Sequence, residues 1–500
     1  MITAKELDLL KAQAQYEKMC QFLRQAVEDG MRADQVERGL FPQAMEMCLH
    51  MLRAFVESRG TGDEGPTIER EGKTMQRLPE PHEKRYLSIF GELMISRSVY
   101  GTREGQAIEW VPLDAAVGLP AGENSYVLED WLQRLCVKEP YAESVENLRA
   151  WLGTTVSVRT AERINGDMAQ YSDGFRQKDG IPSPEEDEGI LVVTVDGTGV
   201  RMRRPLAQRL AGDAAASPSA QQSSQTTGSG RDGKKQMAYV GSVYSIDSYV
   251  RTVEDVVDEV CRRQRSSDRP RPVQKTLWAE MTHIREGETW PAVPGLFLEL
   301  AVECHERDPS RQKPLVCVMD GERQFWSFQE EWFPHAVGIL DLYHVMERLR
   351  AVARCIHPNG GPPESEFVNH QLRLLLQGKV GYVIRNFSRL VRTGKLSKGV
   401  KQTIQSAIGY FQNNRKHMRY DEYLAAGYPI ASGAVEGACK HFVKDRMDGA
   451  GMRWEIEGAQ SILSLRAIYL NGHWDDFIAY RANKEQQALY GEDAQTALAT

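Results

Sequence analysis

Two short apolar runs, each ending in Asp-Gly, decide the fold: GILVVTVDGTGV at residues 189–200 and KPLVCVMDGERQFW at residues 313–326. Both runs are rich in β-branched residues and bounded by turn residues, which is typical of buried strands. A helix-like span at 293–306 precedes the second run, and another strand-like run, AVGIL, follows at 336–340. Strands that alternate with helices in this way predict an α/β fold.

The first strand has a predicted partner in MAYVGSVYSI at residues 237–246. Residues 211–230 between them contain only Ala, Gly, Ser, Pro, Gln and Thr apart from one Asp. Such a composition offers nothing for a packed core and predicts disorder. We therefore interpret residues 205–235 as a disordered connection inside one sheet.

The acidic residues Asp196 and Asp320 come directly after the two strands, where α/β proteins commonly bind ligands. Taken alone, Asp-Gly after a strand is usually just a turn. A third carboxylate, Glu436, falls in the first turns of a helix that Ser432 can cap. That helix face could equally be a solvated one with i,i+4 ion pairs to Lys440. The small residues around Glu436 instead favour the close approach of another group.

Two aspartates and a glutamate in one pocket would supply the hard oxygen ligands that Mg²⁺ or Mn²⁺ prefers. Two such ions can support phosphoryl transfer in nucleic acids. The order strand, strand, helix is the order that a ribonuclease H-like core needs. We therefore predict that Asp196, Asp320 and Glu436 are the catalytic and metal-binding residues, holding two ions.

The charge of the chain is unevenly distributed. The net charge is −7, yet residues 367–420 contain no Asp or Glu and eleven Lys or Arg. A solvated face usually mixes both signs, so this stretch favours a polyanionic partner, and we predict DNA. The predicted DNA-binding residues are Arg159, Thr160, Arg163, Arg385, Arg389, Arg392, Lys395, Lys398, Lys401, Lys440, Lys444 and Arg453.

The N-terminal part lacks these strand patterns. Residues 3–57 show helical spacing, and residues 85–100 alternate as a β-hairpin does around Gly91. Residues 142–164 break at Gly153 and resume after Ser157, a good N-cap, which fits a DNA-binding helix-turn-helix. An ordinary helical hairpin fits the same pattern.

Several segments resemble those of the ISKra-type insertion-sequence transposases, a family of bacterial DDE transposases. They are VTVDGTGV, KPLVCVMDGERQFW, GILDLYHV, RMRYDEYLAAGYPIASGAVEGACKHFVKDRMDGAGMRW and LRAIYLNGHWDDF, and the likeness spans about residues 80–480. The resemblance implies that Asp196, Asp320 and Glu436 form a ribonuclease H-like catalytic triad. Asp341 and His344 also resemble the Asp-x-x-His motif of Mutator-like transposases. We expect these two residues to support the site, with His344 bracing it, although a His there could also bind metal or phosphate.

We therefore expect a ribonuclease H-like α/β core interrupted by an all-helical insertion, behind a helical and helix-turn-helix N-terminal region. The expected parts are a helical region at 1–60, a hairpin and helix-turn-helix region at 76–180, a catalytic core at 186–345 and 429–482, a basic helical insertion at 346–428, and a tail at 483–500.

The expected function is DNA transposition: cleavage at the terminal inverted repeats and strand transfer into target DNA, by a dimer or larger homo-oligomer. The N-terminal helices are candidates for its interface. A nuclease without strand transfer, or a domesticated DNA-binding regulator, is the alternative.

No apolar run approaches the roughly 18 residues of a membrane span, and residues 1–19 lack a secretory pattern. We expect a cytoplasmic, nucleoid-associated protein. The eight cysteines form no CxxC pair, which argues against a zinc ribbon.

Overall fold

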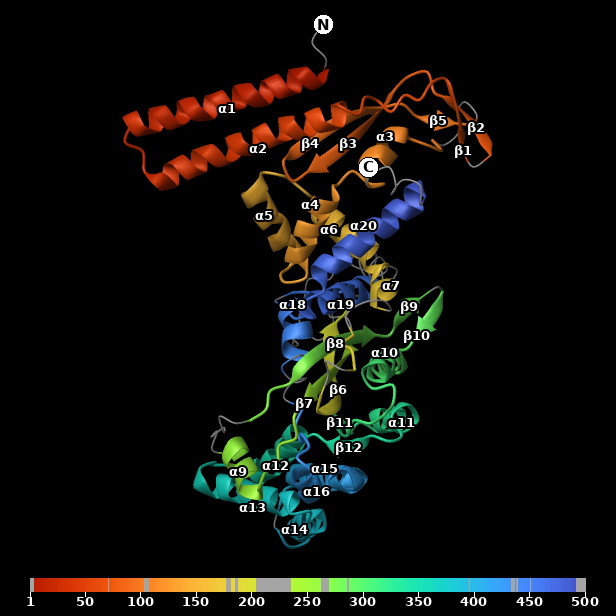
Figure 1. Cartoon of the computed structure of the whole chain (residues 1–500). Helices are drawn as coiled ribbons and strands as arrows, with labels where there is room; N and C mark the ends of the chain where they lie inside the picture. Colours follow the sequence, from red (N-terminus) through yellow and green to blue (C-terminus); the bar gives the residue numbers. More distant parts are fainter. Residues whose placement is uncertain are drawn as a thin grey trace, which may run out of the picture. The chain divides into compact units, whose positions relative to one another are not determined.

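The structure is a computed structural model, and it divides into two compact units (Figure 1). One unit comprises Met1–Phe175 with Trp474–Thr500, and the other comprises Arg176–His473. The residues that it describes are 4–70, 72–102, 108–176, 181–184, 188–203, 235–261, 269–285, 287–394, 396–432, 437, 439–449 and 451–491.

The second unit is built on a five-stranded mixed sheet with the order β12-β11-β6-β7-β8. Strand β6 pairs antiparallel with β7, which pairs antiparallel with β8, whereas β11 and β12 extend the other side of β6 in parallel. The strands are β6 (Ile190–Arg201), β7 (Lys235–Ile246), β8 (Val273–Met281), β11 (Leu315–Met319) and β12 (Val337–Leu340). The expected α/β class is confirmed, as is the pairing of the two strands that flank the predicted disordered connection. Of that connection, residues 205–234 lie outside the described residues.

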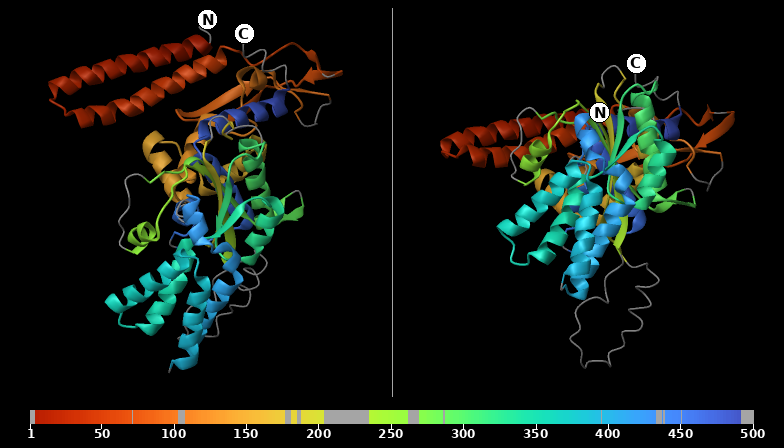
Figure 2. Two further views of the ribbon diagram at one scale, coloured as in Figure 1. Left: turned by 60° about the horizontal axis from the view of Figure 1, so that its bottom comes forward. Right: turned by 90° about the horizontal axis from the view of Figure 1, so that it is seen from below.

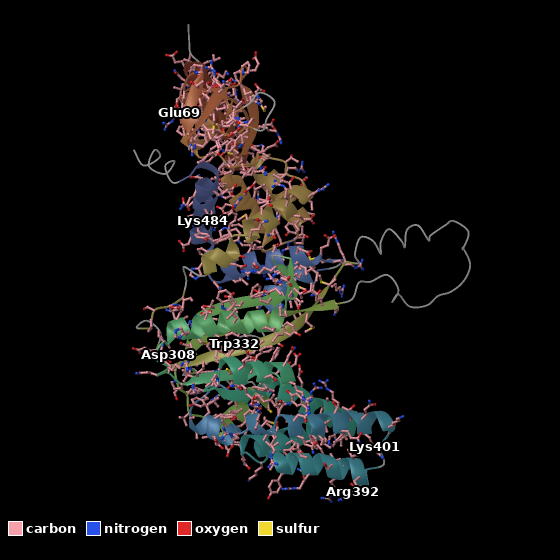
Figure 3. All side chains as sticks on the ribbon, turned by 90° about the vertical axis from the view of Figure 1, so that its right-hand side faces the viewer. Glu69, Asp308, Trp332, Arg392, Lys401 and Lys484 are labelled. Atoms are coloured by element: carbon pink, nitrogen blue, oxygen red, sulfur yellow. The ribbon has the colours of Figure 1, made fainter. Side chains whose placement is uncertain are left out.

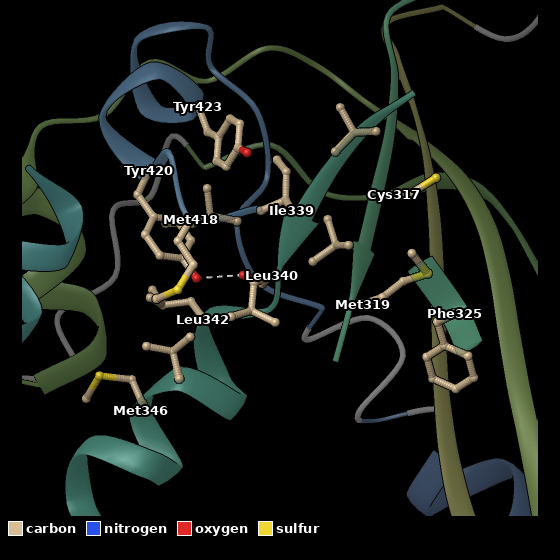
Figure 4. Packing of buried hydrophobic residues seen from close by; sticks show 14 of the residues in the cluster. Cys317, Met319, Phe325, Ile339, Leu340, Leu342, Met346, Met418, Tyr420 and Tyr423 are labelled. Atoms are coloured by element: carbon tan, nitrogen blue, oxygen red, sulfur yellow. Dashed lines mark hydrogen bonds between the residues drawn. The ribbon is translucent and has the colours of Figure 1, made fainter. Parts of the chain in front are cut away.

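Helices cover the sheet because its central strands are apolar on both faces. Helix α10 (Ala292–Arg307) packs on β7 and β8, and α11 (Arg323–Trp332) packs on α10. The fit is close at Gly241 on β7, where a Cβ atom would lie 2.9 Å from the Leu300 side chain. Figure 4 shows the core beside β12, where the Tyr420 hydroxyl donates to the Leu340 carbonyl at 2.7 Å.

The open edge of β8 is closed by side chains from α19 (Ile456–Leu470) and its C-cap. The Asn471 side chain bonds both the N–H and the C=O of Leu277, at 2.9 and 3.1 Å. The Gln460 side chain accepts from the N–H of Met281 at 2.8 Å. These amides take up the part of the β8 edge around Leu277 and Met281, where another strand could otherwise pair.

The predicted insertion after β12 is helical throughout its described residues (Figure 2). Its elements are α12 (Leu342–Ile356), α13 (Pro362–Leu376), α14 (Val380–Thr393), α15 (Lys398–Asn413), η1 (Arg415–His417) and α16 (Tyr420–Ala425). The unit also contains α9 (Val253–Cys261), β9 (His283–Arg285), β10 (Glu288–Trp290), the π-helix η2 (Cys439–Lys444) and α18 (Asp445–Met447).

The first unit starts with two 25-residue helices, as expected, followed by small sheets and a three-helix group. Its elements are α1 (Ala4–Glu28), α2 (Ala33–Glu57), β1 (Thr67–Arg70), β2 (Lys73–Arg77), β3 (His82–Ser88), β4 (Gly91–Arg97), β5 (Tyr100–Gly101), α3 (Pro112–Val117), α4 (Tyr126–Cys136), α5 (Tyr141–Leu152), α6 (Val158–Ala169), α7 (Ser172–Arg176) and α20 (Trp474–Tyr490). The predicted hairpin around Gly91 is present as β3 and β4.

Two parts of the chain differ from expectation. Strands β1, β2 and β8 were not predicted, and β8 is the third strand of the antiparallel half of the sheet. Helix α20 continues to Tyr490, into the segment that we expected to be a tail, and it groups with the N-terminal elements. Arg481 on α20 forms a buried ion pair with Glu129 on α4, which fixes the helix there.

All eight cysteines are free thiols, and none of the described helices is both long and apolar enough to cross a membrane.

Candidate metal centre

The sheet brings Asp196 and Asp320 side by side. In the parallel pairing of β6 with β11, Val195 lies opposite Met319, and each aspartate is the next residue along its strand. Asp196 therefore lies within the long strand β6, whereas Asp320 comes directly after the last residue of β11. Adjacent parallel strands place successive residues at the same level, so the two carboxylates share one lip of the sheet.

A third candidate ligand, His344, comes from the first turn of α12. One ligand atom from each of Asp196, Asp320 and His344 lies within 4.8 Å of the other two. All three side chains are partly exposed, so the cluster is open to a ligand. Sequence reasoning placed His344 beside the site as a brace, and the structure places it among the possible ligands as well.

The buried Asp341 organises this end of α12. Its side chain is fully buried and caps the helix by accepting from the N–H of Tyr343 at 3.1 Å. One carboxylate oxygen accepts from His344 Nδ1 at 2.9 Å and from the Ser432 hydroxyl at 2.7 Å. The Ser432 N–H also donates to Asp341, at 3.1 Å. Because Nδ1 of His344 is occupied by Asp341, Nε2 is the nitrogen left for a ligand, the arrangement commonly seen for metal-binding histidines.

The electrostatics of the cluster follow from burial and like charge. Burial raises the pKa of the Asp320 carboxyl, and the negative charges of Asp196 and Asp341 act in the same direction. The hydrogen bond that His344 donates to Asp341 raises the pKa of His344 to about 9. Burial and the charge of Asp320 raise the pKa of the nearby Glu322 carboxyl. Crowded carboxylates of this kind favour a bound cation, which would relieve their repulsion.

Gly321 explains why glycine follows the second aspartate. A Cβ atom there would lie 2.4 Å from the Tyr410 ring and 2.6 Å from the Asn414 amide, both of which belong to the helical insertion. The Asn414 side chain is held in turn by the indole N–H of Trp326 at 2.9 Å. The glycine therefore allows the insertion to pack directly against the loop that carries Asp320.

The predicted third carboxylate, Glu436, lies outside the described residues, as do residues 433–435 and 438. The π-helix η2, which starts three residues later, contacts β6. Arg466 on α19 holds η2 by donating from Nε to the Phe442 carbonyl at 2.7 Å. The chain therefore returns to the strand that carries Asp196 just after Glu436. Single π-helical turns often occur at functional sites because they re-aim the residues beside them.

Most predicted DNA-binding residues of the insertion are exposed on two neighbouring helices. Arg385, Arg389 and Arg392 are exposed on one face of α14, and Lys398 and Lys401 lie in the first turns of α15. Figure 3 shows Arg392 and Lys401 at one end of the insertion. Lys395 lies outside the described residues, and Lys440, Lys444 and Arg453 are exposed elsewhere in the same unit.

The predicted helix-turn-helix is formed by α5 and α6 in the other unit. Helix α5 ends at Gly153, whose φ of 71° ends the helix, and the Ser157 hydroxyl caps α6 by accepting from the Thr160 N–H at 3.0 Å. Both helices pack against α4. Arg159 is exposed on α6, whereas Arg163 pairs with Asp167 on the same helix. These contacts confirm two helices joined by a turn, which fits both a helix-turn-helix and an ordinary helical hairpin, and DNA binding by α6 is a prediction.

Of the four tryptophans at positions 326, 332, 454 and 474, three are buried and have structural roles. Trp454 is buried, donates to the Met447 carbonyl at 3.1 Å and lies under the Arg446 guanidinium. Trp326 is buried and stacked on the His417 ring at 3.7 Å, and Trp474 is also buried. Trp332 retains partial exposure, at 37%.

Two features of the site were not foreseen from the sequence. One is the bridge from Asp341 to Ser432, which links the start of α12 to the segment that leads to Glu436. The other is the acidic side chain of Glu322, two residues after Asp320; the Asp-Gly-Glu order was its only signal in the sequence.

No model of a known protein family matches the chain, and no curated protein matches it significantly. We therefore infer the function from the geometry of the site.

Proposed function

We propose that the second unit is a ribonuclease H-like core and that the chain is a DNA transposase. The strand order supports this fold: three antiparallel strands (β6, β7, β8) are followed by two parallel strands on the other side of β6. Helix α10 lies between the third and fourth strands, as the fold requires. The helical insertion follows the last strand, β12, and precedes Glu436, which agrees with the resemblance to DDE transposases.

The observation that carries the proposal is the convergence of Asp196, Asp320 and His344 within 4.8 Å. A set of two carboxylates and one imidazole is less typical of Mg²⁺ than of Mn²⁺. Both ions accept oxygen ligands. Asp341 fits the same interpretation, because it orients His344 from behind. The described residues offer one such cluster, so a second ion would depend on Glu436.

The chemistry that such ions supply is activation of water for cleavage and of a DNA 3′-hydroxyl for strand transfer. The protein side chains then have separate tasks. Asp196, Asp320 and Glu436 hold the reacting centre, and Asp341 fixes the ring of His344. The cations of α14 and α15 bind DNA phosphates, whose approach the carboxylates alone would oppose. In this proposal α6 reads the terminal inverted repeats in the major groove.

The test is cleavage and joining of a labelled DNA that carries the inverted repeats flanking the gene, with Mg²⁺ or Mn²⁺. The proteins compared are the intact chain, Asp196→Ala, Asp320→Ala and Glu436→Ala, with Asp308→Ala as a control carboxylate outside the cluster. The proposal expects joined products from the intact chain and the control alone. Cleavage without joining would instead identify a nuclease. If the proteins bound DNA and none of them cleaved it, the chain would be a regulator.

A further inference from the structure

The helices α1 and α2 form an antiparallel pair with very little core of its own. Asp8 on α1 marks the side that faces α2, because its carboxylate lies 3.4 Å from His50 Nδ1 and 3.9 Å from the Arg53 guanidinium. Among the described residues of the pair, the apolar side chains that are almost completely buried are those of Ala12, Ala26, Ala54 and Val56. Two helices that share mainly alanines need further contacts to be stable.

Large apolar side chains instead follow one side of α1. Leu9 comes one residue after Asp8, about 100° around the helix from the side that faces α2. From there the heptad positions continue without a charged residue. They are Leu9, Gln13, Tyr16, Cys20, Leu23 and Val27. Leu9, Tyr16, Leu23 and Val27 are 47%, 58%, 41% and 83% exposed.

Helix α2 carries a matching stripe. Met51 comes one residue after His50, so it lies about 100° around α2 from the side that faces α1. In an antiparallel pair, equal rotations from the facing sides lead to the same side of the pair. The stripe on α2 starts after Glu37 and consists of the uncharged residues Leu40, Ala44, Met47, Met51 and Phe55. Met51 and Phe55 are 52% and 50% exposed. One side of the pair therefore carries uncharged stripes over residues 9–27 of α1 and 40–55 of α2.

The uncharged stripes together form a sizeable surface. They cover residues 9–27 of α1 and 40–55 of α2, so they are roughly 25 Å long, and two helices side by side are roughly 20 Å wide. The footprint is therefore roughly 500 Å², somewhat more than half of the ~800 Å² that each partner contributes to a standard protein–protein interface. It lies at the upper end of the apolar patches that monomers expose.

We propose that this surface binds the same surface of a second copy of the chain, forming a four-helix bundle about a twofold axis. A seam without charges is typical of homodimer interfaces, which are more apolar than transient ones. Two antiparallel pairs that meet face to face also supply the core that each pair lacks. The proposal does not rest on the catalytic one, because none of its residues belongs to the metal centre.

The test measures the mass of the full chain by sedimentation equilibrium at two concentrations. A homodimer of ordinary affinity should be dissociated at about 1 µM and formed at about 50 µM. The variant Tyr16→Glu/Leu23→Glu places charges in the seam. Leu7→Glu is the matched control, since Leu7 is similarly exposed, at 48%, and precedes Asp8 on the opposite side of α1. We expect a dimer for the intact chain and for Leu7→Glu. The seam variant should dissociate with a constant raised at least roughly 100-fold, because the symmetry removes four apolar contacts per dimer.

Hydrogen exchange on the intact chain gives a second readout that needs no variant. Dilution below the dissociation constant should reduce the protection of α1 and α2 and leave that of β6 and β11 unchanged. An intact chain that is monomeric at about 50 µM would overturn the proposal and leave the surface to a different protein. A seam variant that dimerises as tightly as the intact chain, or no more weakly than Leu7→Glu, would overturn it as well.

Discussion

Replacing Asp341 by Asn tests how the candidate metal centre is held together. The buried carboxylate accepts four hydrogen bonds: from the N–H of Tyr343, from His344 Nδ1, and from the N–H and hydroxyl of Ser432. Asparagine has the same shape but only one acceptor oxygen. Its amide group would replace the oxygen that accepts from His344 and from the Ser432 hydroxyl. That amide donor would face the N–H of His344, whereas the Ser432 hydroxyl can rotate and accept from it.

The magnitude follows from the bond lost at His344 and from the weaker, neutral bond left at Ser432. A hydrogen bond to a charged group contributes about 1.5–3 kcal/mol and a neutral one about 0.5–1.5 kcal/mol, so the free energy of unfolding should fall by roughly 2–5 kcal/mol. This is a large part of the ~5–15 kcal/mol that stabilises a typical domain. The pKa of His344 should also fall from about 9 toward the ~6.5 of a free histidine, because the Asp341 hydrogen bond is its main cause.

Urea denaturation and NMR titration of His344 measure the two effects. Ser432→Ala is the control, because it removes one hydroxyl and leaves the bond from His344 to Asp341 intact. It should cost about 1–3 kcal/mol and leave the His344 pKa near 9. If Asp341→Asn lost less than about 1 kcal/mol and kept the His344 pKa unchanged, the account of this bridge would be refuted.

Three further results are expected. Burial lowers the pKa of His417 to about 4, so the contribution of the neutral His417 ring to stability is complete above pH ~6.5 and is lost as the pH falls toward 4. The loss should be on the order of 3 kcal/mol, measured by unfolding experiments that compare the intact chain with His417→Phe. Gly321→Ala should destabilise the second unit by more than about 1 kcal/mol, measured by urea denaturation, because the added methyl group overlaps a ring of the helical insertion. The triple variant of Arg385, Arg389 and Arg392 to Ala should weaken DNA binding for all sequences and reduce the slope of log K against log salt by up to about 3.

Each of these results has a control and a contrary outcome. His417→Phe keeps a ring beside Trp326, but this ring cannot take up a proton. If the stability of this variant depended on pH as strongly as that of the intact chain, the role of His417 would be contradicted. Gly399→Ala, on α15, meets no atom within 4 Å and should be neutral or stabilising. For the arginines, replacing the three exposed residues Arg24, Arg32 and Arg38 of the N-terminal helical pair by Ala should leave the salt slope nearly unchanged. An equal loss of slope in that control would show that the effect is one of overall charge.

The sequence predicted the parts of the fold that depend on local pattern. The runs before Asp196 and Asp320 are short, apolar and β-branched, and they form β6 and β11 as expected. The cap at Ser157 and the break at Gly153 were equally predictable, because both depend on a few neighbouring residues. The two aspartates lie side by side because β6 pairs in parallel with β11, although β7 and β8 come between these strands in the chain and β6 continues past Asp196.

Other features depend on contacts between distant residues. Strand β8 starts with three exposed residues, Val273, Gln274 and Lys275, and gains its place only by pairing with β7 and by the edge contacts of Gln460 and Asn471. Helix α20 is fixed by the pair of Arg481 with Glu129, more than 300 residues apart in the chain. The bridge between Asp341 and Ser432 also spans 91 residues. Local pattern carries no information about such partners.

The most direct test of the account is Mn²⁺ binding to the full chain, measured by calorimetry and by electron paramagnetic resonance. We expect the intact chain and Asp308→Asn, a carboxylate outside the cluster, to bind the ion alike. Asp196→Asn and Asp320→Asn should each weaken binding at least about 10-fold, because each removes a charged ligand from the cluster. Equal affinity and stoichiometry in all four proteins would contradict the claim that these two aspartates form a metal centre.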